Sequence, residues 1–285
     1  MLQFASPKSV REALTLLKQG RGKDRIISGG TNVIPEMRAQ AFLPRRLIDI
    51  SRLKNLAYIK EERRKIRIGG LIPIAELISS SVLQLYAPIL CQTARQLGNP
   101  QVRNRATLAG NLADASPAAD MAVPLLVLEA AVVAARAGRK DRAIPIQEFF
   151  LGPNKTTLQR DELIREIIFS KPGSAARMGY FKLGLRNAMA ISVCSAALLA
   201  EFEGETCRKV RIALGAAAPV PMRACETEKI LEAKEWRPEV LEAACARAAQ
   251  EISPIADIRA TADYRRSMAS VLLRRLCEQV SRGER

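Results

Sequence analysis

The sequence predicts a globular protein that mixes helices and strands, and three observations support this. Short apolar runs bounded by turn residues alternate with amphipathic helical patterns over the first 170 positions. Three longer strand-like runs then follow one another, and helical patterns continue to the end. A hydrophobic content of 48% over 285 residues is enough to bury the core of one large or two medium domains.

The first hundred residues alternate short helices and strands. Residues 7–20 are predicted to form a helix that Ser6 caps and Gly20 ends. The elements that follow are strands at 25–28, 46–50, 56–59 and 65–68, a helical turn at 33–38, and helices at 74–80 and 88–97. This order differs from a Rossmann unit because the GxGxxG fingerprint is absent.

The second half of the chain is predicted to contain a linker, further strands and two terminal helices. Residues 170–179, which contain a Pro-Gly pair, are predicted to be a linker. The other expected elements are an apolar segment at 119–128, strands at 131–135, 163–169, 180–185, 191–202 and 210–216 with a hairpin at 203–205, and helices at 238–252 and 261–280. The apolar face expected for the last helix comprises Tyr264, Met268, Val271, Leu272 and Leu276.

The absence of histidine limits the chemistry of this chain. It excludes Ser-His-Asp and Cys-His catalytic sets and any histidine-ligated metal. The six cysteines show no CxxC or similar spacing, which argues against an iron–sulfur cluster or structural zinc here. We therefore predict no catalytic and no metal-ligating residue, and expect a cofactor to carry any reaction.

The charge balance indicates an acidic or phosphorylated partner. The chain has 45 basic and 29 acidic residues, a net charge of +16. The arginines near its end lie on a helical pattern with few aromatic residues, so we expect a solvated or partner-facing surface and no nucleic-acid binding. We expect no membrane span, no secretory signal and a cytoplasmic location, because long apolar runs and a basic leader are absent and the cysteines are scattered.

Two small-residue segments are candidate binding loops. Residues 25–32 read RIISGGTN, and residues 99–120 read NPQVRNRATLAGNLADASPAAD. Glycine lets the backbone approach a ligand closely, and consecutive N–H groups in such turns bind anions. Together the loops suit a ligand with two adjacent phosphates, although either alone is more typical of an ordinary tight turn.

These segments resemble the FAD-binding subunit of the molybdenum hydroxylases, which is the xanthine dehydrogenase and carbon monoxide dehydrogenase flavoprotein family. The resemblance covers nearly the whole chain in order, through SGGTN at 28–32, NPQVRNRATLAGN at 99–111, ASPAAD at 115–120, FKLGLRNAMAIS at 181–192, ALGAAAPVPMRA at 213–224 and ADYRRSMASVLLRR at 262–275. The stretches GPNKTTL and FKLGLRNAM look most like a bacterial xanthine dehydrogenase FAD subunit.

The resemblance implies an α+β fold with two domains. Residues 1–172 would form a vanillyl-alcohol-oxidase-type (PCMH-type) FAD-binding domain of two α+β subdomains, at about 1–55 and 56–172. Residues 173–285 would form a C-terminal domain with a three-stranded antiparallel sheet and helices. It also implies non-covalent FAD, which agrees with the absence of a histidine for covalent attachment.

The resemblance also assigns cofactor-binding residues position by position. The first loop would wrap the pyrophosphate with Ile26, Ile27, Ser28, Gly29, Gly30, Thr31 and Asn32. The second would hold the diphosphate and ribityl side with Thr107, Ala109, Gly110 and Asn111. Asp120, Leu163 and Lys182 match further contacts, and a cation at Lys182 would favour anionic reduced flavin. From the residues alone, Asp120 could equally be a helix N-cap, Leu163 a core residue and Lys182 a surface lysine.

Two positions depart from the family pattern. Ala109 replaces the first glycine of the usual GGN, and its methyl group would clash if the backbone there needs a positive φ. Asn32 replaces the more usual aspartate, which removes one negative charge near the phosphates.

The resemblance implies an electron-transfer subunit of a heterotrimeric enzyme. Electrons from an N-heterocycle, such as a purine, would pass from a molybdenum-containing large subunit through the 2Fe-2S clusters of a small subunit to FAD, and then to NAD⁺ or another acceptor. Two alternatives stay open at this stage. One is a basic scaffold protein with a degenerate flavin site, for which Ala109 is the hint. The other is a free-standing flavin oxidase, which lacks a suitable base.

Overall fold

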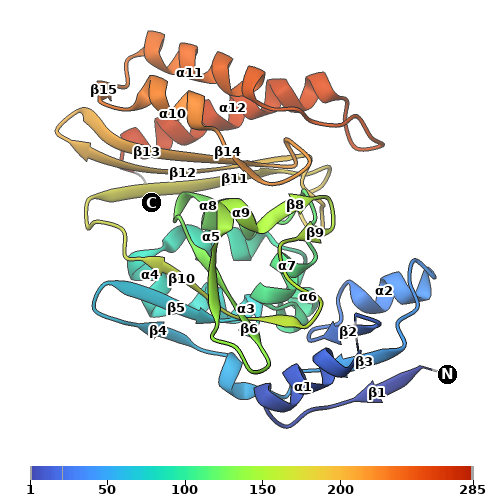
Figure 1. The fold of residues 1–285 in the computed structure, drawn as a ribbon. Coiled ribbons are helices and arrows are strands. Elements are labelled where there is room, and N and C mark those ends of the chain that lie inside the picture. Colours follow the sequence, from blue (N-terminus) through green and yellow to red (C-terminus); the bar gives the residue numbers. More distant parts are fainter. Residues whose placement is uncertain (1, 21, 284–285) are drawn as a thin grey trace.

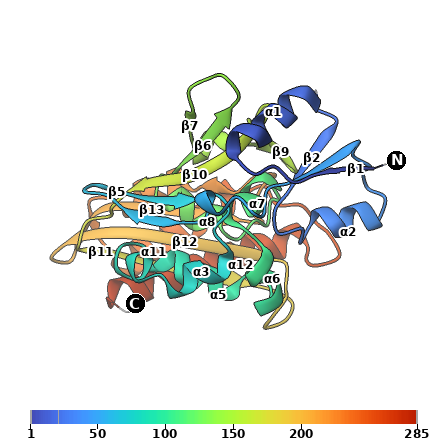
Figure 2. The same ribbon diagram turned by 90° about the horizontal axis from the view of Figure 1, so that it is seen from below.

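The computed structural model describes residues 2–20 and 22–283, and its N-terminal part is a small three-stranded sheet. The strands are parallel in the order β1-β3-β2, with bounds β1 Gln3–Ala5, β2 Asp24–Ile27 and β3 Arg46–Asp49. Helices α1 (Val10–Gly20) and α2 (Val33–Arg38) lie on opposite sides of this sheet (Figures 1 and 2). Only α1 contributes buried residues, whereas α2 contributes none.

The start of α1 differs from the sequence prediction. The helix begins at Val10, and the Ser9 hydroxyl accepts a hydrogen bond from the Glu12 amide at 3.1 Å. Ser9 therefore takes the role that the sequence suggested for Ser6. Pro7 lies before the helix, where its fixed φ is accommodated.

The middle of the chain forms an antiparallel five-stranded sheet in the order β4-β5-β10-β6-β7. Its strands are β4 Ile59–Glu61, β5 Lys65–Gly69, β6 Ala131–Arg136, β7 Arg142–Pro145 and β10 Glu162–Ser170. The 3₁₀ turn Lys54–Leu56 occupies positions where the sequence suggested the start of a strand. A two-stranded hairpin of β8 (Phe150–Gly152) and β9 (Lys155–Thr156) precedes β10.

Helices cover this sheet, and two of them replace a predicted loop. The bounds are α3 Ile74–Ser79, α4 Ser81–Tyr86, α5 Pro88–Gln96, α6 Pro100–Arg105, α7 Leu108–Ala113, α8 Ala122–Val127 and α9 Ile146–Phe149. The segment from Asn99 to Asn111 is thus two short helices, where the sequence suggested turns. The side chains of Asn99 and Thr107 cap α6 and α7, which is why each helix begins where it does.

The C-terminal part is an antiparallel sheet covered by helices. Its elements are β11 Ala176–Leu183, β12 Cys194–Glu203, β13 Thr206–Gly215, β14 Met222–Arg223, β15 Lys234–Glu235, α10 Cys225–Leu231, α11 Pro238–Glu251 and α12 Ala262–Ser281. The three predicted long strands and the hairpin at Gly204 are confirmed, but β11 begins at Ala176, inside the segment 170–179 that was predicted to be a linker. The short strands β14 and β15 were not predicted, whereas α10 lies in the stretch after Pro221 that was predicted to be helical.

The buried face of α12 also differs from the prediction. Leu272 and Leu276 are buried as expected, but Tyr264 is 47% exposed and Val271 36% exposed. Arg265 is buried instead, because it pairs with Asp257 at 2.8 Å and donates to the carbonyls of two neighbouring segments.

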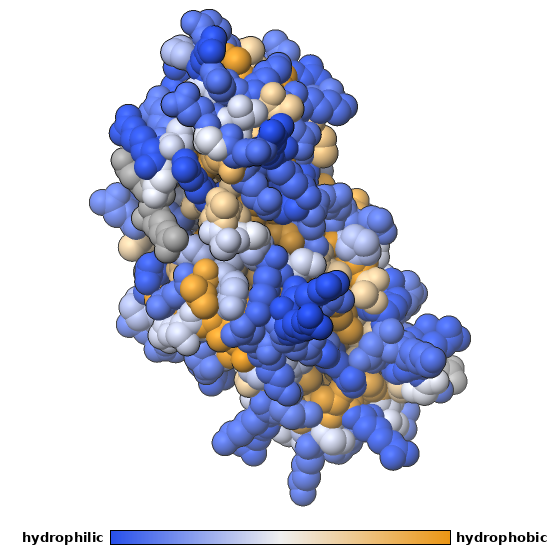
Figure 3. All heavy atoms as spheres, turned by 90° about the vertical axis from the view of Figure 1, so that its left-hand side faces the viewer, coloured by the Kyte–Doolittle hydropathy of each residue, from blue (hydrophilic) through white to orange (hydrophobic). Residues whose placement is uncertain are grey.

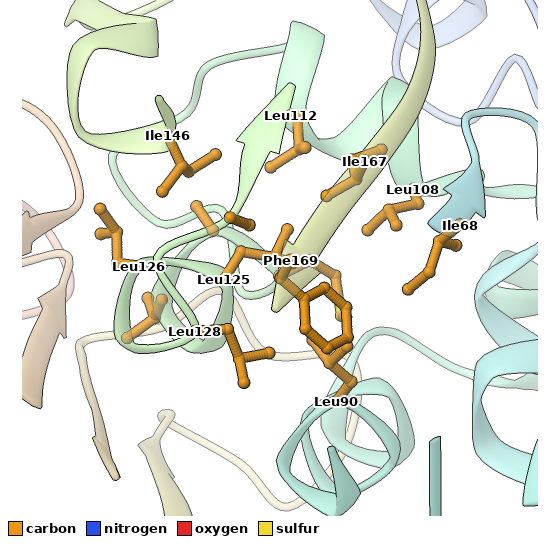
Figure 4. Packing of buried hydrophobic residues seen from close by; sticks show 14 of the residues in the cluster. Ile68, Leu90, Leu108, Leu112, Leu125, Leu126, Leu128, Ile146, Ile167 and Phe169 are labelled. Carbon is orange, nitrogen blue, oxygen red and sulfur yellow. The ribbon is translucent and has the colours of Figure 1, made fainter. Parts of the chain in front are cut away.

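Alternating residues of the C-terminal sheet join two cores. On β12, Leu198 packs with α11 and α12, whereas its neighbour Leu199 packs into the core of the middle part. Figure 4 shows that second core, in which side chains from α5, α7, α8 and β10 converge. A third core fixes the N-terminal sheet, where Ile48 and the apolar face of α1 meet Leu71 and Leu163 of the middle part.

The face of the molecule drawn in Figure 3 is mostly polar. Figure 3 shows one face on which hydrophilic side chains dominate and apolar atoms form scattered patches. None of the helices in the described ranges combines the length and the apolar character that crossing a bilayer requires.

Candidate functional site

The two candidate loops lie against each other between the N-terminal sheet and the middle part of the chain. The hydroxyls of Ser28 and Thr107 are 3.1 Å apart although 79 positions separate them in the sequence. A Cβ on Gly29 would lie 1.9 Å from the carbonyl oxygen of Arg105. Only glycine permits this approach, so the first glycine of the SGGTN segment serves the packing of the two loops.

The second glycine shapes the first loop for anion binding. Gly30 has φ +74°, which L side chains rarely adopt. Within the described ranges, the N–H groups of Gly29, Gly30, Thr31 and Asn32 donate no hydrogen bond to the protein. Four consecutive donors without a protein partner form a concavity suited to phosphate oxygens.

The second loop contributes differently from the expectation. The N–H groups of Leu108 and Ala109 donate to the carbonyls of Ile72 and Gly70, at 3.1 and 2.9 Å. The N–H of Gly110 donates to the Thr107 hydroxyl at 3.1 Å. These donors are therefore consumed in holding α7, and this segment offers side chains to a ligand in place of backbone N–H groups.

Ala109 creates no strain at its position. It lies inside α7 and is not among the described residues with a positive φ. Its side chain is 8% exposed and packs next to Gly70, where a Cβ would approach the Ala109 methyl to 3.1 Å. The concern that an alanine here distorts the loop does not apply, because helical backbone accepts any L residue.

A cavity of about 420 Å³ opens between the two segments. One wall comes from the first loop and α7, and the opposite wall from Leu158 to Ile164 at the start of β10. Leu97 and Val102 add apolar surface at one side, and Asp114 and Asn154 add polar atoms at another. A volume of this order, with apolar side chains and convergent polar groups in the same lining, is typical of cofactor sites.

A second cavity of about 370 Å³ lies beside the same loop. It shares Ser28 to Thr31 with the larger cavity and is otherwise lined by residues such as Ile27, Arg38 and Arg105. The loop is therefore accessible from two sides, and Arg38 and Arg105 add positive charge at one of them.

The predicted site residues fall into three groups. Those that line the larger cavity are Ile26, Ser28, Gly29, Gly30, Thr31, Asn32, Thr107, Ala109, Gly110, Asn111 and Leu163. Ile27 lines only the smaller cavity. Asp120 and Lys182 line neither cavity.

Asp120 and Lys182 form a buried pair instead. The Lys182 ammonium lies 2.6 Å from the Asp120 carboxylate and also donates to the carbonyl of Gln96 at 3.3 Å. Tyr180 and Ser192 donate to the other oxygen of Asp120, at 3.1 and 2.7 Å. Burial raises the pKa of Tyr180 well above its ordinary value, so its hydroxyl remains a donor. Asp120 caps no helix, since α8 begins two positions later.

Sequence reasoning missed most of the opposite wall. The lining residues of this wall are Leu158, Gln159, Arg160, Glu162, Leu163 and Ile164, of which only Leu163 was expected, and the nearby Asn154 and Thr156 were also missed. Glu162 is held by Arg142, with two bonds of 2.8 Å, and by the Gln159 amide at 2.7 Å. Asn154 has φ +57°, so the Pro-Asn turn before β9 was the one local signal near this wall.

These residues fit a dinucleotide cofactor such as FAD. The free N–H groups at Gly29 to Asn32 match a diphosphate, and the Asn111 amide contributes a further polar group because only its oxygen is used, by the Met121 amide at 3.2 Å. The apolar side chains in the cavity lining match the aromatic ends of the cofactor.

The comparisons with known proteins agree with this assignment. The family described as "FAD binding domain in molybdopterin dehydrogenase" matches residues 1–172, and "CO dehydrogenase flavoprotein C-terminal domain" matches residues 179–280. The carbon monoxide dehydrogenase medium chain of Hydrogenophaga pseudoflava is 32% identical over 273 residues, covering 96% of this chain and 94% of that protein.

Two further comparisons extend over the whole chain. The xanthine dehydrogenase FAD-binding subunit of Escherichia coli O157:H7 is 28% identical over 284 residues, covering 98% of this chain and 97% of that protein. A solved structure of the Hydrogenophaga pseudoflava carbon monoxide dehydrogenase, in a form that lacks the Mo-pyranopterin moiety, contains a chain with a TM-score of 0.96. That chain is 31% identical, and the match covers 100% of this chain and 98% of that one.

Proposed function

Because the chain belongs to the family of FAD-binding subunits of molybdopterin dehydrogenases, we propose that it relays electrons through FAD within a molybdenum hydroxylase complex. FAD, when bound, supplies the exchange of two electrons. The protein contributes binding and orientation. This chain lacks histidine, and its described residues include no cluster of three or more metal-ligating side chains, so the substrate chemistry belongs to other subunits.

The arrangement of the first loop against α7 is the observation that carries this proposal. The N–H groups of Gly29 to Asn32 would hold the diphosphate, while the Thr107 hydroxyl fixes the start of α7 beside them. Leu163 and its neighbours would exclude water from the cofactor along the opposite wall. The Asp120–Lys182 pair lies outside the cavity lining and would support the site by joining the middle part of the chain to the C-terminal sheet.

We propose a heterotrimer as the working assembly. A large subunit would carry the molybdenum cofactor, and a small subunit with 2Fe-2S clusters would deliver electrons to FAD. The acceptor would be NAD⁺ or another electron carrier, and the complex would act in the cytoplasm. The relatives described above support a multi-subunit enzyme, since one is named a medium chain and another a FAD-binding subunit.

The substrate of the complex lies outside this chain. The sequence suggested a xanthine dehydrogenase-like enzyme acting on a purine, and that assignment stays a proposal. Relatives of similar identity are named for carbon monoxide and for xanthine, so identity at this level does not separate them. The substrate is decided by the subunit that holds the molybdenum.

Isolation of the native assembly tests the proposal. The chain would be tagged and purified from its own cell, and the accompanying subunits identified by mass spectrometry. We expect a molybdenum-containing large subunit, a 2Fe-2S subunit and FAD, with flavin absorbance that bleaches when the substrate of the large subunit is added without oxygen. A stable lone monomer without accompanying subunits would contradict the proposal.

The structure removes the argument for the scaffold alternative. It rested on Ala109 as a sign of a degenerate flavin site, and that residue lies unstrained in α7. Two of the three carboxylates that line the cavity within the described ranges are engaged, Asp24 by Arg46 and Glu162 by Arg142, so the free-oxidase alternative would need Asp114 as its base.

A further inference from the structure

The N-terminal sheet has one face that the protein covers incompletely. The face toward α1 is buried, with Ile48 fully covered. On the opposite face Leu47 of β3 is 5% exposed, but α2 itself contributes no buried residue. Parallel sheets are almost always covered on both faces, and here the short helix α2 covers only part of its face, which leaves an open cavity beside it.

Large apolar side chains are exposed on this face. Phe4 is 66% exposed, Leu43 79% and Leu2 46%. Phe4 pairs in register with Leu47, which in turn pairs with Arg25, so one row of side chains crosses the sheet on this side. Leu2 and Leu43, with Met37 and Phe42 among others, line a cavity of about 760 Å³, which we call the α2 cleft.

Cations without acidic partners surround these apolar residues. Lys23, Arg25 and Arg45 line the α2 cleft, and none of them forms an ion pair within the described ranges. Arg25 lies over the ring of Phe42 at 5.1 Å and is thereby held at the cleft. The one acid in the lining, Asp24, is already paired with Arg46.

This face continues to the cofactor loop. Phe4 and Arg38 line the smaller cavity together with Gly29, Gly30 and Thr31. A protein seated on the α2 cleft would therefore extend to the loop that borders the larger cavity. That proximity is what a subunit delivering electrons to the bound cofactor requires.

We propose that the α2 cleft and the adjoining Phe4 surface dock the electron-donating partner subunit through an acidic surface that carries apolar anchors. This inference rests on the proposed function. Apolar anchors within a charged rim are the usual anatomy of such interfaces, and opposite charge accelerates docking. A second copy of this chain is a poorer occupant, because two strongly basic faces would repel each other.

Charge and apolar substitutions in the reassembled complex test the docking site. Leu43→Glu introduces a charge among the apolar residues, and Arg45→Glu reverses a rim cation. Leu151→Glu is the matched control, because Leu151 is 66% exposed on β8 and lines none of the three cavities. Affinity for the co-purified partner subunits would be measured by interferometry at low and high salt, with FAD per chain measured in parallel.

We expect Leu43→Glu to weaken partner binding about tenfold or more, as loss of an interface anchor does, while the Leu151→Glu control binds normally. Arg45→Glu should slow association and reduce its dependence on salt. FAD content should be unchanged in all three. Normal partner affinity in Leu43→Glu would overturn the proposal.

Other outcomes would also overturn it and identify a different occupant. Loss of FAD in Leu43→Glu would assign the cleft to the cofactor. A wild-type dimer in light scattering that Leu43→Glu dissociates would assign it to a second copy. A wild-type chain that carries no FAD contradicts the proposed function itself, whereas a wild type with FAD and partners but normal binding by Leu43→Glu contradicts only the docking site.

Discussion

The hydroxyl of Ser28 lies 3.1 Å from the hydroxyl of Thr107, and this contact joins the two halves of the cofactor cavity. Ser28 directly follows β2 of the N-terminal sheet, and Thr107 is the N-cap of α7 in the middle part. Neighbouring positions are equally close, since Gly29 packs on the Arg105 carbonyl. The cavity therefore depends on how well these two elements pack against each other. We call this contact the Ser28–Thr107 seam, and substitutions there should weaken FAD binding first.

Gly29→Ala should push the two loops apart at the Ser28–Thr107 seam. The new methyl group would lie 1.9 Å from the Arg105 carbonyl oxygen, and backbone on both sides must shift to relieve it. We expect a loss of about 1–3 kcal/mol in the free energy of unfolding and a large loss of bound FAD. Gly152→Ala is the control, because a Cβ there meets no atom within 4 Å and its φ is not positive. Denaturant unfolding and flavin absorbance check both, and a Gly29→Ala protein with normal FAD content would contradict the packing argument.

Thr107→Val should weaken FAD binding because it removes the cap of α7. The Thr107 hydroxyl accepts the Gly110 amide and caps α7, and valine keeps the shape but loses that acceptor. We expect a loss of about 1 kcal/mol in the free energy of unfolding, and FAD binding weaker by about tenfold in fluorescence titration of the apoprotein. Thr107→Ser retains the hydroxyl and should bind FAD nearly as well as the wild type. Equal affinity in the valine and serine variants would show that the cap does not shape the site.

The buried pair of Asp120 and Lys182 should behave as a structural link. Asp120→Asn leaves the Lys182 ammonium without its counter-charge in a site where the side chain is 6% exposed. Losing one partner of such a pair typically costs about 3–5 kcal/mol, so we expect a strongly lowered free energy of unfolding. The double variant Asp120→Asn with Lys182→Met should recover part of that loss, because no lone charge remains. Additive costs of the two single substitutions, measured in a double-mutant cycle, would argue against the link.

Glu166 should give the fold a dependence on acidic pH. Burial alone would raise the pKa of Glu166, but bonds from Arg67 at 2.6 Å and Tyr58 at 2.6 Å outweigh it, and the pKa lies below its ordinary value of 4.5. The carboxylate therefore stabilises the fold above the pKa of the unfolded chain, and this contribution is lost as the pH falls through the folded pKa. Burial and Glu166 raise the pKa of Tyr58 to about 12, so its hydroxyl stays a donor throughout this range.

Glu166→Gln tests this contribution. We expect the variant to lose about 1–3 kcal/mol in the free energy of unfolding at neutral pH, where the charged bonds are intact in the wild type. The difference between the two proteins should shrink as the pH is lowered below 4.5. Urea titrations at a series of pH values check this, and a difference that stays constant down to acidic pH would contradict it.

Some of this site was predictable from the sequence and some was not. Gly29 and Gly30 were predicted correctly as a tight turn because the glycines are local signals. The helix α7 was not predicted, since Gly110 and Asn111 disfavour helices, and tertiary bonds from its first N–H groups to Gly70 and Ile72 stabilise it. The wall at Leu158 to Ile164 depends on pairing β10 with strands far away in the chain, which no local pattern shows.

The buried face of α12 shows the same limit. The sequence pattern placed Tyr264 toward the core and gave no reason to bury Arg265. In the structure Arg265 is covered because Asp257 neutralises it and the carbonyls of Val193 and Ala216 accept hydrogen bonds from its guanidinium. Val193 and Ala216 lie 72 and 49 positions away from Arg265 in the sequence, so the burial of this charge could not be expected from helical periodicity.

The flavin content of the purified wild-type chain tests the central claim most directly. Absorbance spectra before and after denaturation, with FAD quantified in the protein-free supernatant, measure both occupancy and the mode of attachment. The account predicts about one FAD per chain, released intact on denaturation because no covalent bond holds it. A colourless protein that takes up no FAD on reconstitution, although it is folded and contains the Ser28–Thr107 seam, would contradict it.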